Sequence, residues 1–149
     1  MQQPHRRIRQ IGALPFRTCP NGDRDLFLVT TRGGGRWIIP KGNPIAGLAP
    51  HEVAAREAFE EAGLVGAADR ISIGCFEFSR RREGRVETCV VDVFPLQVQQ
   101  RLQTWAEAQE RSVLRCNVEI AASLIRLPSL SALIRDYFAG DAIRRVAPA

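Results

Sequence analysis

The most constraining feature of this sequence is a loop rich in glycine and proline that leads directly into a helix with clear start and stop signals. Residues 40 to 48 hold two prolines and two glycines, which predicts a loop. Pro50 suits the first helical position, and Gly63 suits the left-handed residue just past a helix end. We therefore predict a helix over residues 50 to 62, preceded by a loop whose exposed backbone could meet an anion.

The acidic side chains of this helix fall on one face. Glu57, Glu60 and Glu61 stand at positions i, i+3 and i+4, which are neighbours on a helix surface. Like charges at that spacing repel each other by about 0.2–0.5 kcal/mol per pair. The helix macrodipole also disfavours negative charge at the C-terminal end, where they lie. A hard divalent cation such as Mg²⁺ removes this conflict because it favours carboxylate oxygens. The alternative interpretation is a solvated acidic face.

The remaining segments predict a mixed sheet covered by helices. Strands come in runs rather than in alternation with helices, which favours an α/β (α+β) fold with a mixed β-sheet. Glu83-Gly84 predicts a hairpin turn between two long strands. The expected strands are residues 8 to 17, 26 to 31, 36 to 39, 71 to 79, 86 to 97 and 112 to 118, and the expected later helices are residues 119 to 126 and 129 to 139.

The composition predicts one globular domain. The 149 residues are 45% hydrophobic and 25% charged, which suffices for a single core. The sequence has no 18-residue apolar run and no apolar segment behind the N-terminal arginines, so we expect a cytoplasmic protein without a membrane span. The cysteines lack CxxC spacing, and we interpret them as reduced thiols, with Cys75 and Cys89 in the core, over a disulfide or zinc site.

The positive charge comes almost entirely from arginine. The net charge is +5, and Lys41 is the only lysine among the 21 Lys and Arg residues. Either position 41 needs a compact ammonium or the arginine bias reflects composition alone. An arginine cluster at the predicted hairpin tip either captures a phosphorylated substrate or only makes the turn soluble; its members are Arg80, Arg81, Arg82 and Arg85. The charge suits a phosphate-rich ligand. The sequence shows no interleaved basic and aromatic stripe, so we do not expect nucleic acid as a partner.

The segment from Gly42 to Leu64 resembles the Nudix box, G-x5-E-x7-R-E-U-x-E-E-x-G-U, in which U is aliphatic. Ala58 stands at the aliphatic position, and Leu48 departs from the pattern because the family has Glu there. The matching residues are Gly42, Arg56, Glu57, Glu60, Glu61, Gly63 and Leu64. Residues 37 to 42, Trp-Ile-Ile-Pro-Lys-Gly, and the later Trp105-Ala106-Glu107 resemble segments of Nudix enzymes that hydrolyse diphosphoinositol polyphosphates and dinucleoside polyphosphates.

The resemblance implies a Nudix-type α/β/α sandwich over residues 6 to 140, with flexible termini at 1 to 5 and 141 to 149. It also implies hydrolysis of a phosphoanhydride bond in a small phosphorylated substrate, with Mg²⁺ or Mn²⁺ as cofactor. A dinucleoside polyphosphate or an inositol pyrophosphate is the favoured substrate, and ADP-ribose and nucleotide sugars are alternatives. The sequence gives no indication of oligomeric state.

The resemblance further assigns roles to single residues. Glu57 or Glu61 would activate the attacking water, with Arg56 supporting the acidic cluster. Lys41, Arg80 and Arg82 would contact the substrate. Glu107 is a second candidate for a base or a metal contact. The expected metal ligands are Glu57, Glu60, Glu61 and the carbonyl of Gly42.

Leu48 keeps a second function open, because a Nudix fold without the family Glu could bind a nucleotide as a sensor without cleaving it. Glu52 lies one helical turn further on and could partly substitute for the missing carboxylate. All three helix glutamates are kept, however, which favours catalysis. We therefore expect an active enzyme in which Leu48 faces protein rather than metal.

Overall fold

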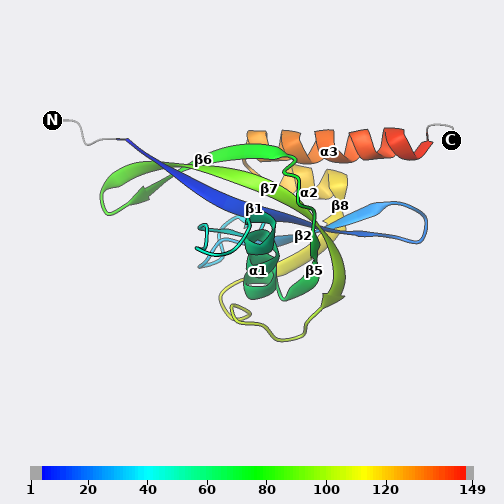
Figure 1. The fold of residues 1–149 in the computed structure, drawn as a ribbon, viewed down its shortest axis with the longest axis horizontal. Helices are drawn as coiled ribbons and strands as arrows, with labels where there is room; N and C mark the ends of the chain where they lie inside the picture. Colours follow the sequence, from blue (N-terminus) through cyan, green and yellow to red (C-terminus); the bar gives the residue numbers. More distant parts are fainter. Residues whose placement is uncertain (1–4, 147–149) are drawn as a thin grey trace.

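The computed structural model describes residues 5 to 146, with side chains described as far as Gly140. This part of the chain forms an eight-stranded mixed sheet and three helices (Figure 1). The strands are β1 (Arg6–Thr18), β2 (Arg24–Thr30), β3 (Trp37–Ile38), β4 (Lys41–Gly42), β5 (Leu64–Ala68), β6 (Gly74–Arg82), β7 (Arg85–Arg101) and β8 (Val113–Asn117). The helices are α1 (Pro50–Ala62), α2 (Val118–Leu124) and α3 (Pro128–Val146).

The long strands β1 and β7 form the centre of the sheet. They run parallel, from Arg6 opposite Glu87 to Phe16 opposite Gln97. Their other neighbours, β2, β4, β5 and β6, run antiparallel to them, so the predicted mixed sheet is confirmed. The short strand β4 pairs with β1 at Gly12 opposite Lys41, which fixes the start of the predicted loop beside the centre of the sheet.

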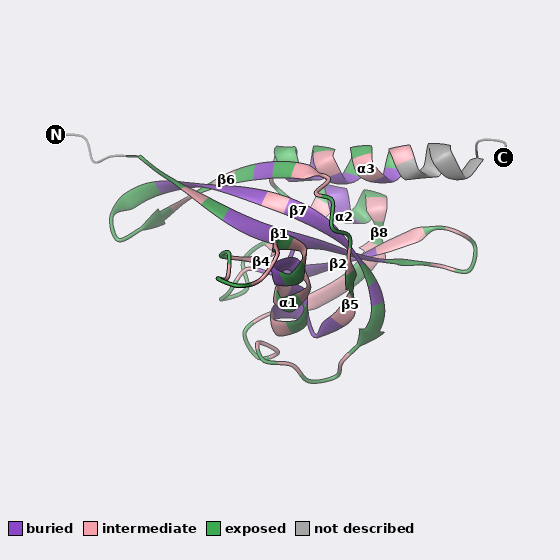
Figure 2. Cartoon of the chain, in the orientation of Figure 1, coloured by how far each residue is buried: buried purple, intermediate pink, exposed green. Residues whose placement is uncertain are grey.

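Helices cover both faces of the sheet, which confirms the predicted sandwich (Figures 1 and 2). On one face α1 packs against β1, β4 and β5, and its buried positions are mostly small residues that allow close approach. On the other face α3 lies over β6, and its Phe138 meets Phe16 of β1 edge to face at 5.7 Å between ring centroids. The core between these layers contains fully buried Leu14, Leu28 and Val93.

The structure differs from the sequence predictions where pairing depends on distant segments. Strand β5 was not predicted, because its small residues carry little strand signal; Gly66 is needed there, since a Cβ would overlap the backbone oxygen of Gln97 on β7. Lys41–Gly42 was predicted to be loop but pairs with β1. Helix α3 continues to Val146, past its predicted end at residue 139. Residues 1 to 4 and 147 to 149, predicted to be flexible, lie outside the described residues.

Two further sequence expectations meet the structure here. All four cysteines are free thiols, and Cys89 is buried as predicted. Cys75 is exposed, contrary to the prediction, because alternation along β6 turns it away from the core and towards Asp92. No helix within residues 5 to 146 combines the length and the apolar character needed to cross a bilayer.

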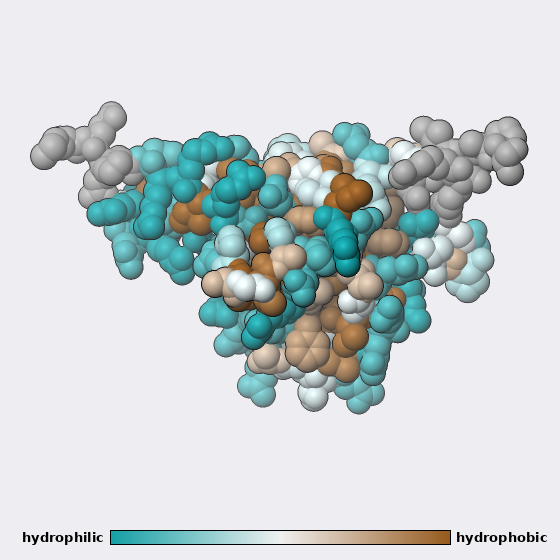
Figure 3. Space-filling model, in the orientation of Figure 1, coloured by the Kyte–Doolittle hydropathy of each residue, from teal (hydrophilic) through white to brown (hydrophobic). Residues whose placement is uncertain are grey.

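Beyond the helices, β6, β7 and the first residues of β1 project as an arm, and hydrophilic residues crowd its surface (Figure 3). The antiparallel register of β6 and β7 runs to Arg82 opposite Arg85 at the tip. Because side chains alternate along a strand, Arg80 and Arg82 point to one face of the arm and Arg81 to the other. The arginine cluster of the sequence therefore divides between two surfaces.

Candidate active site

Helix α1 is held at both ends, and this fixes where its glutamates lie. Glu52 reaches back to accept a hydrogen bond from the Ala49 N–H at 2.9 Å, because Ala49 cannot cap the helix with its own side chain. At the other end Gly63 adopts the left-handed conformation (φ 66°, ψ 28°), as predicted, and its N–H bonds to Phe59 O. The carboxylate of Glu52 is thus committed to the helix start rather than to replacing the family Glu.

The backbone of β4 lies directly against two of the three glutamates. Gly42 is required by this contact, because a Cβ there would overlap the carboxylate of Glu57. The preceding N–H, that of Lys41, points to Glu61 Oε1 at 3.4 Å. Pairing of β4 with β1 therefore sets the distance between the loop and the acidic face of α1.

Glu57 and Glu61 form a carboxyl pair in which Glu61 is buried and Glu57 is half-buried. Burial raises the pKa of Glu61 to about 8, with Arg111 opposing the shift and the charge of Glu57 adding to it. Burial likewise raises the pKa of Glu57; a hydrogen bond with Glu61 partly offsets this, and the charge of Glu60 adds to it. Two ionisable carboxyls are thus held together with less positive charge nearby than they need to ionise readily.

Glu60 lies apart from this pair. Arg56 Nε donates to Glu60 Oε1 at 3.0 Å, in the i,i+4 geometry of an ordinary helix ion pair. The Arg56 side chain is 54% exposed and the Glu60 side chain 37% exposed. The structure therefore brings together the predicted ligands Glu57, Glu61 and Gly42, and leaves Glu60 and Arg56 paired with each other at the edge.

Within the described residues, no three His, Cys, Asp or Glu side chains gather closely enough to form a metal site as they stand. The Glu57–Glu61 pair nevertheless fits a hard divalent cation, because burial raises the pKa of both carboxyls and a cation would relieve that cost. The oxygens available for it are these carboxylates, and the backbone of Gly42 lies directly against that of Glu57.

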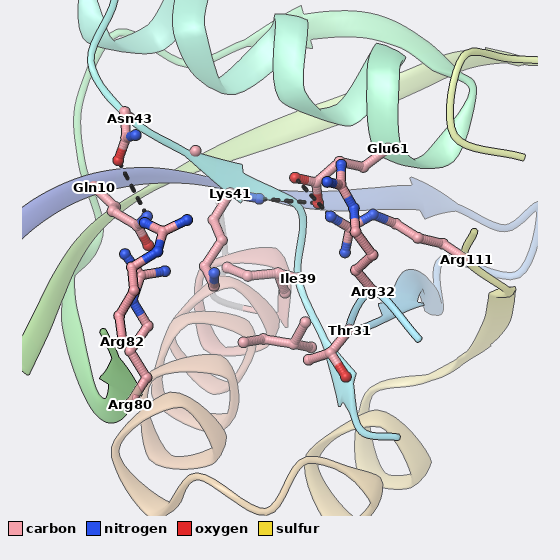
Figure 4. A pocket seen from close by; sticks show the side chains of 12 residues that line it. Gln10, Thr31, Arg32, Ile39, Lys41, Asn43, Glu61, Arg80, Arg82 and Arg111 are labelled. Atoms are coloured by element: carbon pink, nitrogen blue, oxygen red, sulfur yellow. Dashed lines mark hydrogen bonds and ion pairs between the residues drawn. The ribbon is translucent and has the colours of Figure 1, made fainter. Parts of the chain in front are cut away.

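A pocket of about 380 Å³ opens beside Glu61, the member of the carboxyl pair that lines it (Figure 4). Figure 4 shows Lys41 in the middle, with Glu61 and Arg111 at one end and Arg80 and Arg82 at the other. Burial lowers the pKa of Lys41, Glu61 partly offsets this, and Arg80 and Arg111 reinforce it. The Lys41 Nζ lies 4.6 Å from the centre of the Phe78 ring. Lys41, Arg80 and Arg82, the predicted substrate contacts, all line this pocket.

The remaining pocket wall contains residues that the sequence analysis missed. Arg111 is nearly buried and places Nη2 3.7 Å from Glu61 Oε2, and Arg32 lies beside it on the loop after β2. Gln10 donates to Asn43 Oδ1 at 3.2 Å at the other end. None of these residues lies in a local motif. The high arginine content of the sequence was the one signal, and it pointed only to Arg32 and Arg111.

A second chamber of about 560 Å³ adjoins this pocket, and Lys41, Arg32 and Arg80 line both. Its own walls combine an apolar and a basic part. None of the described residues that line it is acidic. The residues that line it alone include Trp37, Phe78, Leu127, Arg36 and Arg126.

Leu48 packs as expected. It is half-buried and lies against the hydrophobic core, so its side chain faces protein. The position that holds Glu in the family motif therefore contributes to loop packing in this chain.

Comparisons with known proteins agree with this arrangement. Residues 9 to 133 match the family model of the NUDIX domain. Nudix hydrolase 16, mitochondrial, from Arabidopsis thaliana is 30% identical over 141 residues, which cover 85% of this chain and 77% of that protein. Diphosphoinositol polyphosphate phosphohydrolase 3-alpha from Mus musculus is 34% identical over 86 residues, covering 58% of this chain and 49% of that protein. The crystal structure of a C. elegans Ap4A hydrolase binary complex shares the fold, with a TM-score of 0.66 and 19% identity over 91% of this chain and 98% of that one.

Proposed function

The chain belongs to the Nudix family, and on that premise we propose that it hydrolyses the phosphoanhydride bond of dinucleoside polyphosphates or inositol pyrophosphates, with Mg²⁺ or Mn²⁺ as cofactor. Family membership makes it a Nudix hydrolase that acts on small phosphorylated substrates. One observation carries the finer proposal: the buried carboxyl of Glu61, which is paired with Glu57, and a set of cationic side chains line one pocket. The cations are Arg32, Lys41, Arg80, Arg82 and Arg111.

The carboxyl pair supports the metal-dependent step. Glu57 and Glu61, with the Gly42 carbonyl, would hold a divalent cation. When bound, such a cation neutralises phosphate charge and lowers the pKa of the attacking water. The carboxylate that the cation does not fully engage, Glu57 or Glu61, would accept the proton of the attacking water.

The cationic end of the pocket supports a substrate with more charge than one diphosphate. Lys41 separates the carboxyl pair from Arg80 and Arg82 (Figure 4). A scissile phosphate beside Glu61 would therefore leave Arg80 and Arg82 for phosphates further along the substrate. Guanidinium groups suit this role because they bind phosphate oxygens with two parallel hydrogen bonds.

The second chamber supports a bulky group beyond the phosphates. An aromatic ring, such as a nucleobase, could lie against Trp37 or Phe78, with Arg36 and Arg126 at the rim. An inositol ring carrying several phosphates would use the arginines and gain little from the aromatic rings. The chamber therefore favours a dinucleoside polyphosphate over an inositol pyrophosphate as the substrate.

A substrate panel tests the proposal. The purified protein is assayed with Mg²⁺ and with Mn²⁺ on a dinucleoside tetraphosphate, an inositol pyrophosphate, ADP-ribose, a nucleotide sugar and a simple phosphomonoester. We expect anhydride cleavage that EDTA abolishes, fastest on the dinucleoside polyphosphate. Comparable hydrolysis of the phosphomonoester, without anhydride cleavage, would overturn the assignment.

The same panel tests the alternative, a nucleotide sensor without catalysis. This alternative rests on Leu48, which stands where the family motif has Glu. A sensor would bind one of these nucleotides in calorimetry and release no product with any metal. A preference for ADP-ribose or a nucleotide sugar would keep the hydrolase and replace the proposed substrate.

A further inference from the structure

Glu107 lies behind two arginines of the pocket wall and joins them through one oxygen. Its Oε1 accepts from Arg111 Nε at 2.8 Å and from Arg32 Nη2 at 3.0 Å. Both arginines line the pocket. The two arginines come from separate loops, one after β2 and one before β8, so the carboxylate bridges segments far apart in sequence.

The loop that carries Glu107 is itself fixed to the end of α1. The Glu107 N–H bonds to Glu60 O at 3.2 Å, and Trp105 Nε1 bonds to Glu61 O at 2.9 Å. Arg111 has a further tie, because its Nη1 donates to Thr30 O at 3.0 Å. The loop that carries Glu107 is therefore anchored to α1, the helix that carries the carboxyl pair.

We propose that Glu107 is a positioning residue that aligns the guanidinium groups of Arg111 and Arg32 to receive phosphate oxygens of the substrate. The inference rests on the proposed function, since it concerns the same pocket. An aligned guanidinium loses less freedom when it binds a phosphate, so the alignment strengthens substrate binding. Glu107 would act through the arginines and would neither bind the metal nor accept the water's proton.

The two arginines depend on Glu107 to different degrees. Arg32 is 66% exposed and has one other acidic partner, Glu110, at 3.3 Å. Arg111 is 12% exposed and, without Glu107, would keep its hydrogen bond to Thr30 O and its longer contact with Glu61. Loss of Glu107 should thus leave Arg32 with Glu110 and leave Arg111 without the acceptor that orients its Nε.

The test compares Glu107→Leu and Glu107→Gln with the matched control Glu110→Gln, which removes a partner of Arg32 alone. Three quantities are measured on the full chain: the Kd for inorganic pyrophosphate by calorimetry with EDTA present, the Kd for Mn²⁺ by electron paramagnetic resonance without substrate, and kcat and KM on the best substrate. Thermal melting of each variant shows whether it is folded.

We expect Glu107→Leu to weaken pyrophosphate binding and raise KM by at least about tenfold, the scale of one charge-assisted hydrogen bond. Glu107→Gln keeps one acceptor for Arg111 Nε and should lose only about threefold, and Glu110→Gln less than about twofold. The Mn²⁺ Kd and kcat should stay within about threefold of the parent values.

Two results would overturn the inference. If Glu107→Gln weakens Mn²⁺ binding or lowers kcat by about 100-fold, Glu107 is a ligand or a base. If Glu107→Leu folds and binds pyrophosphate as the parent does, or if the parent itself does not bind pyrophosphate, the arginines need no alignment by Glu107. A parent that binds pyrophosphate but hydrolyses nothing in the panel overturns the proposed function alone, and the variants' pyrophosphate affinities still decide the role of Glu107.

Discussion

Trp105 donates its indole N–H to the backbone oxygen of Glu61 at 2.9 Å, and its ring lies over Gly63. The loop between β7 and β8 is therefore docked on the last turn of α1, beside the carboxyl pair. A side chain at Gly63 would interfere with this docking, because a Cβ would come within 2.7 Å of the Trp105 ring.

Gly63→Ala should lower the free energy of unfolding by roughly 1–3 kcal/mol, from left-handed strain and from displacement of Trp105. Gly47→Ala is the matched control, since Gly47 also has a positive φ (86°) but open space around its Cα. Denaturant titration of both variants separates strain from displacement. Equal losses in the two would show that the Trp105 contact contributes nothing.

The metal-free protein should lose stability as the pH rises from about 4.5 to about 8, because the folded-state pKa of Glu61 is raised from 4.5 to about 8. In that window the folded state holds a proton that the unfolded state releases, so stability is highest below it and lowest above it. Thermal melting across this range should show a fall on the order of 5 °C that Glu61→Gln reduces, with a smaller fall remaining because burial also raises the pKa of Glu57. A flat parent profile would contradict the burial cost.

Glu61→Gln should also reduce turnover by at least about 100-fold, because it removes charge from the predicted metal ligands. The variant should fold at least as well as the parent without metal. Melting far below the metal-free parent would mean that the carboxylate is needed for structure rather than for chemistry.

Arg82→Glu should raise KM for a polyphosphate substrate and make it less dependent on salt, because Arg82 lines the pocket. Arg81→Glu changes the net charge equally but lies on the opposite face of the arm, and it should have much less effect. ADP-ribose, with fewer charges, should respond weakly to both. Steady-state kinetics at two salt concentrations make the comparison; equal responses to the two variants would indicate a general charge effect.

Lys41→Arg should lower kcat/KM by about tenfold although it keeps the charge, because a guanidinium is bulkier than the ammonium packed over Phe78. The control is Arg17→Lys, the reverse exchange at an exposed position away from the pocket. The measurement is kcat/KM of both variants on the best substrate of the panel. Unchanged kcat/KM would show that the single lysine reflects composition alone.

Leu48→Glu should change turnover by less than about tenfold, equivalent to about 1.4 kcal/mol in the barrier. Leu48 packs against the core, and Glu52 is already bonded to the helix start, so an added carboxylate has no vacant role near the carboxyl pair. The assay is steady-state hydrolysis with Mg²⁺ titrated. Restoration of activity by Leu48→Glu in an otherwise inactive protein would favour the sensor.

The sequence by itself determined the features that depend on neighbouring residues. Pro50 and Gly63 set the bounds of α1, because a fixed φ and a left-handed conformation act within one turn. The 3.6-residue period placed the three glutamates on one face. The spacing of the motif was sufficient to indicate the family, since its residues lie on one loop and one helix.

Only the tertiary structure decided which of those residues work together. Glu57 and Glu61 meet at Gly42 because β4 pairs with β1, whereas Glu60 turns to Arg56. Arg111 and its partner Arg32 reach the pocket from loops whose positions follow from strand pairing and from the docking of Trp105. Such contacts join residues many positions apart, and local periodicity carries no information about them, because they depend on how the layers of the fold pack.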